Sequence, residues 1–192
     1  MPKVTESHRR AQEERFVDAA RRCFTRLGVE GTSMEQIRTE AGVSAGLMYR
    51  YFASKDDMIR AAIAGSLTEF EAVVDETRSS EQAATPADYL RSLLDNLRRF
   101  RHRSEGVDLF KLAIQGWAHA QSRPAAKAVI TRSFAHQLMS FREVATRWTT
   151  ADKADATALA IGAAAIGYIV QSAFADVEVD VNQFCAGFEP LG

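Results

Sequence analysis

The sequence predicts an all-α protein of about nine helices, and three observations support this fold class. Apolar residues recur at helical spacing along most of the chain, whereas strand-type alternation never lasts for more than a few residues. Helix start and stop signals separate these apolar stripes. The 192 residues are 46% hydrophobic and 26% charged with only 4 prolines, a composition typical of a folded globular chain.

The first helix is indicated by an apolar stripe that ends at Gly28. Phe16, Ala20, Cys23 and Leu27 are spaced so that they lie on one face of a helix. A glycine just beyond such a stripe commonly ends the helix, because glycine adopts the left-handed conformation at little cost. We therefore expect a first helix that reaches Leu27.

Residues 28–58 predict two short helices joined by a tight turn. Gly42 stands where the first of them would stop, and Ser44 can cap the second. Three residue pairs have the spacing of a capping box, in which the N-cap residue and the residue three positions later bond to each other's backbone: Thr32 with Glu35, Ser33 with Gln36, and Ser54 with Asp57. A helix, a tight turn at Gly42 and Val43, and a second helix have the spacing of a helix-turn-helix.

The rest of the chain predicts longer helices. They are expected over Lys55 to about Arg78, after a Thr85 cap followed by Pro86 and Asp88, around Phe110 to Trp117, over roughly 124–149 and 155–175, and over Val181 to Phe188 after an Asp180 cap. We divide the chain into a helix-turn-helix domain over residues 1–54 and a helical body over residues 55–192.

One segment also has the length of a membrane span. The run from Ala156 to Ala175 carries no charge, but it is rich in alanine and glycine, contains Gln171 and lacks a flanking cluster of lysine or arginine. Small residues allow close approach of helix backbones, so we favour a helix buried on nearly every side and expect no membrane association. A second subunit would cover any side that its own chain leaves open.

Cysteine content favours a cytoplasmic protein, and the charge distribution has the sign that a nucleic-acid partner at the N-terminal end requires. Residues 1–60 carry 11 Lys/Arg and 9 Asp/Glu, and residues 61–192 carry 13 and 16, so the N-terminal end is slightly positive. The 2 cysteines, Cys23 and Cys185, are far apart and indicate buried thiols in a reducing compartment. The opening residues lack the apolar core of a signal peptide.

The sequence shows no sign of catalytic or metal chemistry. Its 4 histidines form no ligand-spaced pair, and neither cysteine has a nearby partner for a metal. No nucleophile motif, phosphate loop or coupled carboxylate pair occurs. We therefore expect neither an enzyme nor a bound metal or cofactor.

The segment Ser44 to Phe52 has the character of a helix that enters a DNA groove. Its first turn holds small residues, which would let the helix lie deep in a major groove. The Tyr49 hydroxyl and the Lys55 amine could contact phosphates, while Met48 would pack against the first helix. From this pattern alone, two alternatives remain open: aromatic residues that fill a core, and a solvated helix cap.

A family resemblance favours DNA binding over these two alternatives. Residues 28–58, which read GVEGTSMEQIRTEAGVSAGLMYRYFASKDDM, resemble the DNA-binding module of the tetracycline-repressor (TetR) family of bacterial transcriptional regulators almost position for position. The preceding helix matches too, and the resemblance covers roughly the first third of the chain. It implies a homodimeric regulator, most often a repressor, which binds a near-palindromic double-stranded DNA operator and is released by a small-molecule effector.

The resemblance also implies roles for individual residues. Thr32 and Ser33 would hold phosphates at the start of the second helix. The residues that would face the bases are Ser44, Ala45, Gly46, Leu47 and Arg50, and those that would contact the backbone are Tyr49, Tyr51 and Lys55. Arg38 departs from the family pattern, which has a small residue there, so its side chain must reach outward or the angle of the hairpin must shift.

For the body, the resemblance implies an effector pocket and a dimer interface. The pocket candidates are Phe70, Phe110, Ile114, Trp117, Phe134, Tyr168 and Gln171, which would suit a lipophilic or aromatic effector. The two long helices near the C-terminus could pair with their copies in a second subunit. Two rival functions are a helical small-molecule-binding protein whose helix-turn-helix is only structural, and a nonspecific architectural DNA protein.

Overall fold

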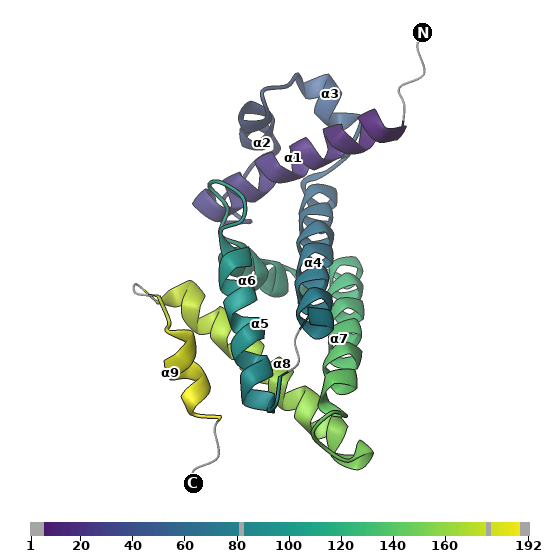
Figure 1. Cartoon of the computed structure of the whole chain (residues 1–192). Helices are drawn as coiled ribbons and strands as arrows, with labels where there is room; N and C mark the ends of the chain where they lie inside the picture. Colours follow the sequence, from purple (N-terminus) through teal and green to yellow (C-terminus); the bar gives the residue numbers. More distant parts are fainter. Residues whose placement is uncertain (1–5, 81–82, 176–177, 189–192) are drawn as a thin grey trace.

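The computed structural model describes residues 6–80, 83–175 and 178–188, and all regular structure in these ranges is helical (Figure 1). The nine helices of this part are α1 (Glu6–Leu27), α2 (Met34–Ala41), α3 (Ala45–Tyr49), α4 (Lys55–Ser80), α5 (Pro86–Arg101), α6 (Leu109–Ala120), α7 (Pro124–Ala145), α8 (Ala151–Phe174) and α9 (Val181–Ala186). The predicted all-α fold is confirmed.

Helices α1 to α3 and the start of α4 share one apolar core, which we call the N-terminal domain. Phe16 and Phe24 of α1 meet Ile37 of α2, Met48 of α3 and Ile59 of α4 in this core. Figure 1 shows α2 and α3 on the side of α1 that faces away from the rest of the molecule. This arrangement leaves the outer surface of α3 uncovered by the chain.

Local capping fixes the short helices of this domain. Ser33 caps α2 in a reciprocal capping box with Gln36, and Gly42 ends α2 with a φ of 64°. Ser44 caps α3 by accepting from the Leu47 N–H at 3.4 Å. These predicted signals are confirmed, but α3 ends at Tyr49 rather than Phe52, and the N-cap of α2 is Ser33 rather than Thr32.

Helices α5 to α9 and the rest of α4 form the body. Its core contains Tyr89, Leu93, Phe141 and Tyr168, from α5, α7 and α8. The predicted Thr85, Pro124 and Asp180 starts of α5, α7 and α9 are confirmed. Cys23 lies in the core of the N-terminal domain and Cys185 in that of the body, and no disulfide joins them.

The long helix α4 belongs to both cores. Met58 and Ile59 in its first turns lie in the core of the N-terminal domain, whereas Val74 near its end lies in that of the body. Figure 1 shows α4 running from beneath α1 down the length of the body. The domain boundary between residues 54 and 55 therefore stays a prediction, because the first turns of α4 pack in the core of the N-terminal domain and not in that of the body.

Among the described residues, α8 alone is long and apolar enough to cross a membrane, by length and composition. Ala158, Ile161 and Ala165 on one of its faces are buried in the body, while Leu159 and Ile166 on another are 60% and 38% exposed. The expectation that this helix is buried on nearly every side is wrong for the single chain, because α7, α5 and α6 cover only part of it. An apolar outer face remains.

Candidate nucleic-acid interface and apolar cavity

Helix α3 presents one face to the core and the other to solvent. Met48 is 1% exposed and packs in the N-terminal domain, and Leu47 is half-buried beside it. The predicted contact residues on the opposite face are all exposed: Ser44, Ala45, Gly46, Tyr49 and Arg50. The structure thus brings together on one surface the group that the sequence predicts to face DNA.

Gly46 is placed where the chain itself does not require glycine. Its φ lies outside the left-handed region, and a Cβ atom built there would meet no atom of the chain within 4 Å. Glycine in a helix is about 1 kcal/mol less favourable than alanine, so no gain in stability explains it. A smooth surface at this point instead suits the close approach of another molecule.

Two polar side chains on this face have no partner within the described residues. The Tyr49 side chain, on a residue that is 54% exposed, and the Arg50 guanidinium make no hydrogen bond or ion pair there. By contrast, Arg22 and Arg26 of α1 both pair with Glu40, at 2.7 and 3.4 Å. The charge of Arg50 is therefore available to an external anion or base edge.

Two other predicted contact residues, Thr32 and Tyr51, are wholly or partly buried. Thr32 is only 2% exposed, and its hydroxyl donates to the Gly28 carbonyl at 2.7 Å, so the predicted phosphate contact by this side chain is wrong. The Tyr51 ring is half-buried and packs edge-on against Phe16, with centroids 5.3 Å apart. Tyr51 is therefore partly a core residue, because its ring completes the packing under α1.

Ser33 and Lys55 lie at helix starts beside this surface. Ser33 is exposed, and its hydroxyl is engaged in the capping box with Gln36. Lys55 Nζ donates to the Glu30 carbonyl at 3.0 Å, which places the amine near the loop before α2. An ammonium group has two further hydrogens, so this bond still leaves Lys55 able to donate to a phosphate.

Arg38 stabilises the turn that leads into α3. Its Nη1 donates to the Val43 carbonyl at 2.8 Å, and its Nε donates to a Glu35 carboxylate oxygen at 2.8 Å. The hydrogen bond from Arg38 lowers the pKa of Glu35 below its usual value. The Arg38 side chain thus folds back over the turn. The sequence suggested only a side chain that reaches outward or a shifted angle of the hairpin.

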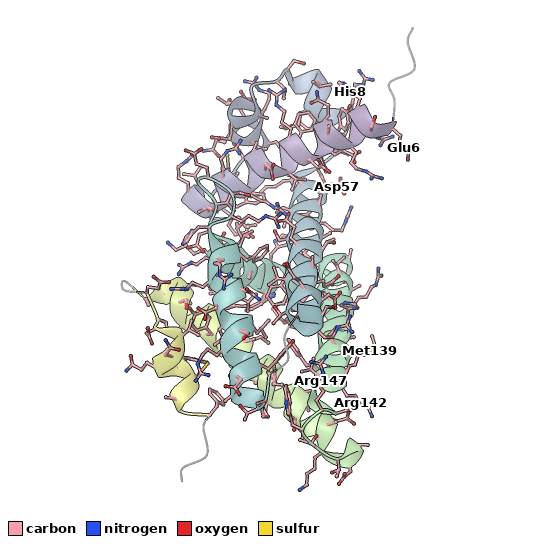
Figure 2. All side chains as sticks on the ribbon, in the orientation of Figure 1. Glu6, His8, Asp57, Met139, Arg142 and Arg147 are labelled. Atoms are coloured by element: carbon pink, nitrogen blue, oxygen red, sulfur yellow. The ribbon has the colours of Figure 1, made fainter. Side chains whose placement is uncertain are left out.

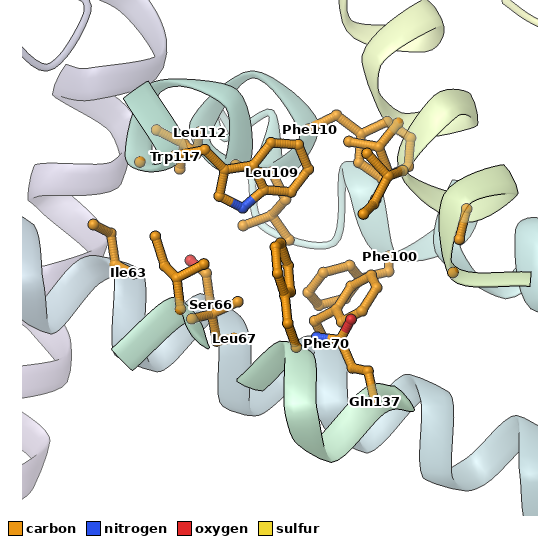
Figure 3. A pocket seen from close by; sticks show the side chains of 18 of the residues that line it. Ile63, Ser66, Leu67, Phe70, Phe100, Leu109, Phe110, Leu112, Trp117 and Gln137 are labelled. Atoms are coloured by element: carbon orange, nitrogen blue, oxygen red, sulfur yellow. The ribbon is translucent and has the colours of Figure 1, made fainter. Parts of the chain in front are cut away.

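The body contains an apolar cavity of about 350 Å³ bounded by α4, α6, α7 and α8, with α5 and the end of α1 (Figure 3). Four predicted pocket residues line it: Phe70, Phe110, Trp117 and Phe134. The sequence missed most of the rest of the wall, including Ser66, Phe100, Gln137 and Phe141. Serine and glutamine on an apolar helix give no local signal that they face a void.

Three predicted pocket residues do not line this cavity. Tyr168 is 1% exposed, packs edge-on against Phe110 and Phe184, and donates to the Val179 carbonyl at 3.2 Å. Gln171 is exposed, and Ile114 is half-buried but is not among the residues that line the cavity. These assignments are wrong because the rotation of each helix about its axis turns the side chains elsewhere.

The N-terminal domain forms part of the cavity wall. Phe24 at the end of α1 and Val29 in the following turn both line it. From α6, Gln115 accepts from the Val29 N–H at 2.7 Å and donates to the Phe24 carbonyl at 3.4 Å. The helix that carries Trp117 is thus hydrogen-bonded to the domain that carries α3.

A buried ion pair adds a second link between the two parts. Arg101 donates to both carboxylate oxygens of Asp108, at 3.1 and 2.8 Å, and the Asp108 N–H donates to the Thr25 hydroxyl at 3.3 Å. Burial alone would raise the pKa of Asp108, but hydrogen bonds from Arg101 and the Lys111 N–H hold this pKa below its usual value. Asp108 also caps α6.

No cluster of three or more potential metal ligands occurs within residues 6–80, 83–175 and 178–188. His119 lies near two carboxylates, with Glu30 at 3.5 Å and Asp56 at 3.9 Å. Glu30 faces the Nδ1 atom of the ring and Asp56 faces the Nε2 atom, so the two carboxylates lie at different ring nitrogens and do not converge on one ion. The charged groups here instead join α6 to the start of α4.

Comparisons with known proteins agree with this geometry. Residues 16–62 match the family model described as bacterial regulatory proteins, tetR family. An uncharacterised HTH-type transcriptional regulator, YfiR of Bacillus subtilis, is 30% identical over 64% of this chain and 60% of its own length. An HTH-type transcriptional repressor of Mycobacterium tuberculosis is 26% identical over 66% of this chain and 67% of its own. The chain thus spans about 60% of the first relative.

Solved structures share the fold over nearly the whole chain. A TetR-family regulator from Mesorhizobium loti superposes with a TM-score of 0.71 at 20% identity, covering 94% of this chain and 93% of its own. A transcriptional regulator from Saccharomonospora viridis, solved in complex with choline, gives 0.68 at 17% identity and covers 93% of each chain. At these identities the likeness concerns the fold alone.

The matched residues 16–62 contain the core of the N-terminal domain, the Gly42 turn and the exposed face of α3. The curated relatives and the solved structures extend the likeness into the body. A regulator of this family is not an enzyme, in agreement with the expectation from the sequence. The chain is thus similar to the tetR family of bacterial regulatory proteins over residues 16–62, and to HTH-type transcriptional regulators over about two thirds of its length.

Proposed function

We propose that this protein is a cytoplasmic homodimeric repressor that binds a near-palindromic DNA operator and is released from it by a small-molecule effector. The observation that carries the proposal is the exposed face of α3, where Gly46 faces open space and Arg50 has no partner within the described residues. Repressors occur among the relatives. A groove-binding helix needs this combination of a smooth surface and free donors.

Each residue of the interface has a proposed role. Ser44, Ala45, Gly46 and Arg50 face the base edges, with the half-buried Leu47 at the margin of this face, and Ser33, Tyr49, Tyr51 and Lys55 contact the phosphate backbone. Arginine donates two hydrogen bonds to guanine, so Arg50 supplies most of the direct base reading. Ala45 and Leu47 have no hydrogen-bonding side chain, and they contribute through thymine methyl groups and DNA shape.

The proposed dimer forms through the outer faces of α7 and α8. Met139 is 64% exposed and Leu159 is 60% exposed, and Figure 2 shows Met139 at the outer edge of the body. Leu138 and Ile166 extend this apolar surface. A two-fold axis here gives each operator two half-sites one DNA turn apart, or a multiple of one.

The dimer proposal is testable by charge substitution. Replacing both Met139 and Leu159 by glutamate puts charges into the proposed interface, and we expect a dimer to become a monomer in sedimentation equilibrium. The matched control replaces two exposed alanines by glutamate: Ala118 of α6, and Ala53 in the turn between α3 and α4. A wild-type protein that sediments as a monomer, or a double variant that stays dimeric, contradicts the proposed interface.

Effector release is proposed to act through the shared wall of the cavity. Phe24 and Val29 of the N-terminal domain line it, and Gln115 joins both to α6. A molecule in the cavity would favour a position of α6 and α4 in which the two α3 helices no longer match the half-site spacing. The effector therefore needs only a difference in affinity between the two states.

An electrophoretic mobility shift with the DNA upstream of its own gene tests the function. We expect a discrete complex that competing unrelated DNA does not remove, and that Arg50→Ala weakens. No complex with this or any selected DNA would favour the rival small-molecule-binding protein, whose helix-turn-helix is only structural. A complex that forms equally with every DNA would favour the architectural protein.

A further inference from the structure

Among the described residues that line the cavity, none carries a charged side chain. Its polar side chains are Ser66 of α4 and Gln137 of α7, together with the indole N–H of Trp117 on α6. Everything else that faces the space is aliphatic, aromatic or glycine. The chemistry of a bound molecule is therefore set by three polar groups and an apolar surface.

Two of these groups are unused hydrogen-bond donors. Neither the Ser66 hydroxyl nor the Trp117 indole N–H has a hydrogen-bond partner in the part of the chain that the structure describes. Figure 3 shows the nitrogen of Trp117 facing the interior of the cavity, on the same side as Ser66. Gln137 lies at the other side, near Phe100, and its Nε2 donates to Ser133 Oγ at 3.0 Å.

One charge behind the wall, on Arg101, is already paired with a carboxylate. The Arg101 guanidinium lies 5.3 Å from the centroid of the Phe110 ring, which lines the cavity. Its donors are engaged by both carboxylate oxygens of Asp108. An ionised molecule in the cavity would lose its hydration without gaining a counter-ion, which is strongly unfavourable.

The aromatic side chains hold fixed positions around the space. Phe70 and Phe100 pack edge-on with centroids 6.4 Å apart, and Trp117 and Phe134 do so at 6.0 Å. Rings that are held in this way offer faces and edges to a further ring without losing side-chain freedom when it binds. A compact molecule with fused rings makes better use of this wall than a flexible chain does.

We propose that the cavity binds an uncharged molecule with an apolar ring system and one hydrogen-bond acceptor, such as a ketone or ester carbonyl, which accepts from Ser66 and Trp117. This inference rests on the proposed function in that the molecule is the effector of the regulator. The volume of about 350 Å³ lies at the small end of the range for drug-sized ligands.

Four probes of nearly equal size test the proposed class by isothermal titration calorimetry. They are acetylphenanthrene, which is neutral with a carbonyl acceptor, isopropylphenanthrene, which is neutral without one, phenanthrene carboxylate, and trimethylammonium phenanthrene. The cationic probe is included because aromatic walls can hold quaternary ammonium groups. We expect acetylphenanthrene to bind at least about tenfold more tightly than either ionised probe.

The carbonyl contact is tested by the ratio of affinities for the acetyl and isopropyl probes. Loss of one neutral hydrogen bond is expected to lower this ratio about three- to tenfold in Ser66→Ala and in Trp117→Phe. Ser122→Ala, at an exposed serine, and Trp148→Phe, at the tryptophan whose indole donates to the Ala83 carbonyl outside the cavity, are the matched controls and keep the wild-type ratio.

Several outcomes overturn the inference. They are tighter binding of the carboxylate or the ammonium probe, no binding of acetylphenanthrene, or an unchanged ratio in both cavity variants. A mobility shift on the same preparations separates this failure from that of the proposed function. Specific DNA binding without binding of the neutral probe contradicts only the proposed ligand class. Binding of the probe without specific DNA binding contradicts the proposed function as a DNA-binding regulator.

Discussion

In the N-terminal domain the candidate functional groups are side chains that the fold leaves exposed, whereas in the body the candidate feature is space that the fold leaves unfilled. Arg50 and Tyr49 lie on a surface that no other element covers, and Gly46 keeps that surface flat. The cavity is lined by helices from most of the chain, among them α4, α6, α7 and α8. A change at α3 should therefore alter binding and spare stability, and a change near the cavity should affect both.

The largest effect is expected at the ion pair that supports the body. Asp108→Ala leaves Arg101 without its carboxylate and removes the cap of α6, so we expect a loss of about 2–4 kcal/mol in the free energy of unfolding. Urea denaturation measures it. Asp95→Ala, which breaks an exposed pair with Arg98, is the control and should cost below about 1 kcal/mol. Equal losses in the two variants would contradict the structural role of Asp108.

The sharpest contrast between the two regions is expected at Gly46. Because a side chain there meets no atom of the chain, Gly46→Leu should leave the free energy of unfolding within about 1 kcal/mol of wild type. The same side chain would project toward the DNA, and we expect affinity for the operator to fall about a hundredfold or more. Fluorescence anisotropy with labelled operator measures the second effect, with Ala118→Leu as a control on α6.

Two outcomes would contradict this prediction for Gly46→Leu. Gly46→Leu could bind the operator as wild type does, which would mean that α3 does not enter a groove. It could instead unfold the N-terminal domain, which would mean that the glycine is needed by the fold.

Arg50→Ala is expected to change which DNA is preferred. A guanidinium that reads a guanine contributes about 1–3 kcal/mol of discrimination against the wrong base. The variant should therefore lose preference at particular base positions and retain affinity for DNA in general, as measured by binding to a set of operators with single base changes. An unchanged preference would remove Arg50 from the base-reading residues.

A smaller effect is expected from Lys55→Ala. Loss of one phosphate contact should lower the slope of the logarithm of affinity against the logarithm of salt concentration by about one, equally for all DNA sequences. Lys111→Ala, at an exposed lysine on α6, should leave the slope unchanged. If both lysines gave the same slope, the amine of Lys55 would serve only the Glu30 carbonyl that it contacts.

The smallest effect concerns pH. The pKa of Asp108 lies below its usual value in the folded state, so its contribution to stability is complete at neutral pH and is lost as the pH falls through the lowered folded-state pKa. Between pH 7 and pH 5 the free energy of unfolding should thus owe no change to Asp108. In stronger acid, wild type should lose stability faster than Asp108→Ala, and parallel pH profiles of the two proteins would contradict the assignment.

How far the sequence predicts each region follows from the range of the contacts involved. Ser33 with Gln36, the Gly42 turn and the Ser44 cap join residues within a few positions of each other, so local spacing predicts them. The family resemblance implies DNA contacts for Thr32 and Tyr51, but their burial depends on the packing of α1 against the turn and α3.

In the body, spacing identifies helices but not the direction in which each side chain points. Phe110 lines the cavity and Tyr168 packs behind it in the core, although both are aromatic residues in apolar helical stripes. The difference arises from the rotation of α6 and α8 relative to each other, which involves residues more than fifty positions apart. Ser66 and Gln137 could be assigned only once that packing was known.

Selection of binding sites from random double-stranded DNA by the wild-type protein tests the central claim most directly. The account predicts enrichment of two inverted half-sites whose centres are one DNA turn or a multiple of one turn apart, and loss of that enrichment with Gly46→Leu. Enrichment of no sequence by a folded wild-type protein would show that the exposed face of α3 does not read DNA.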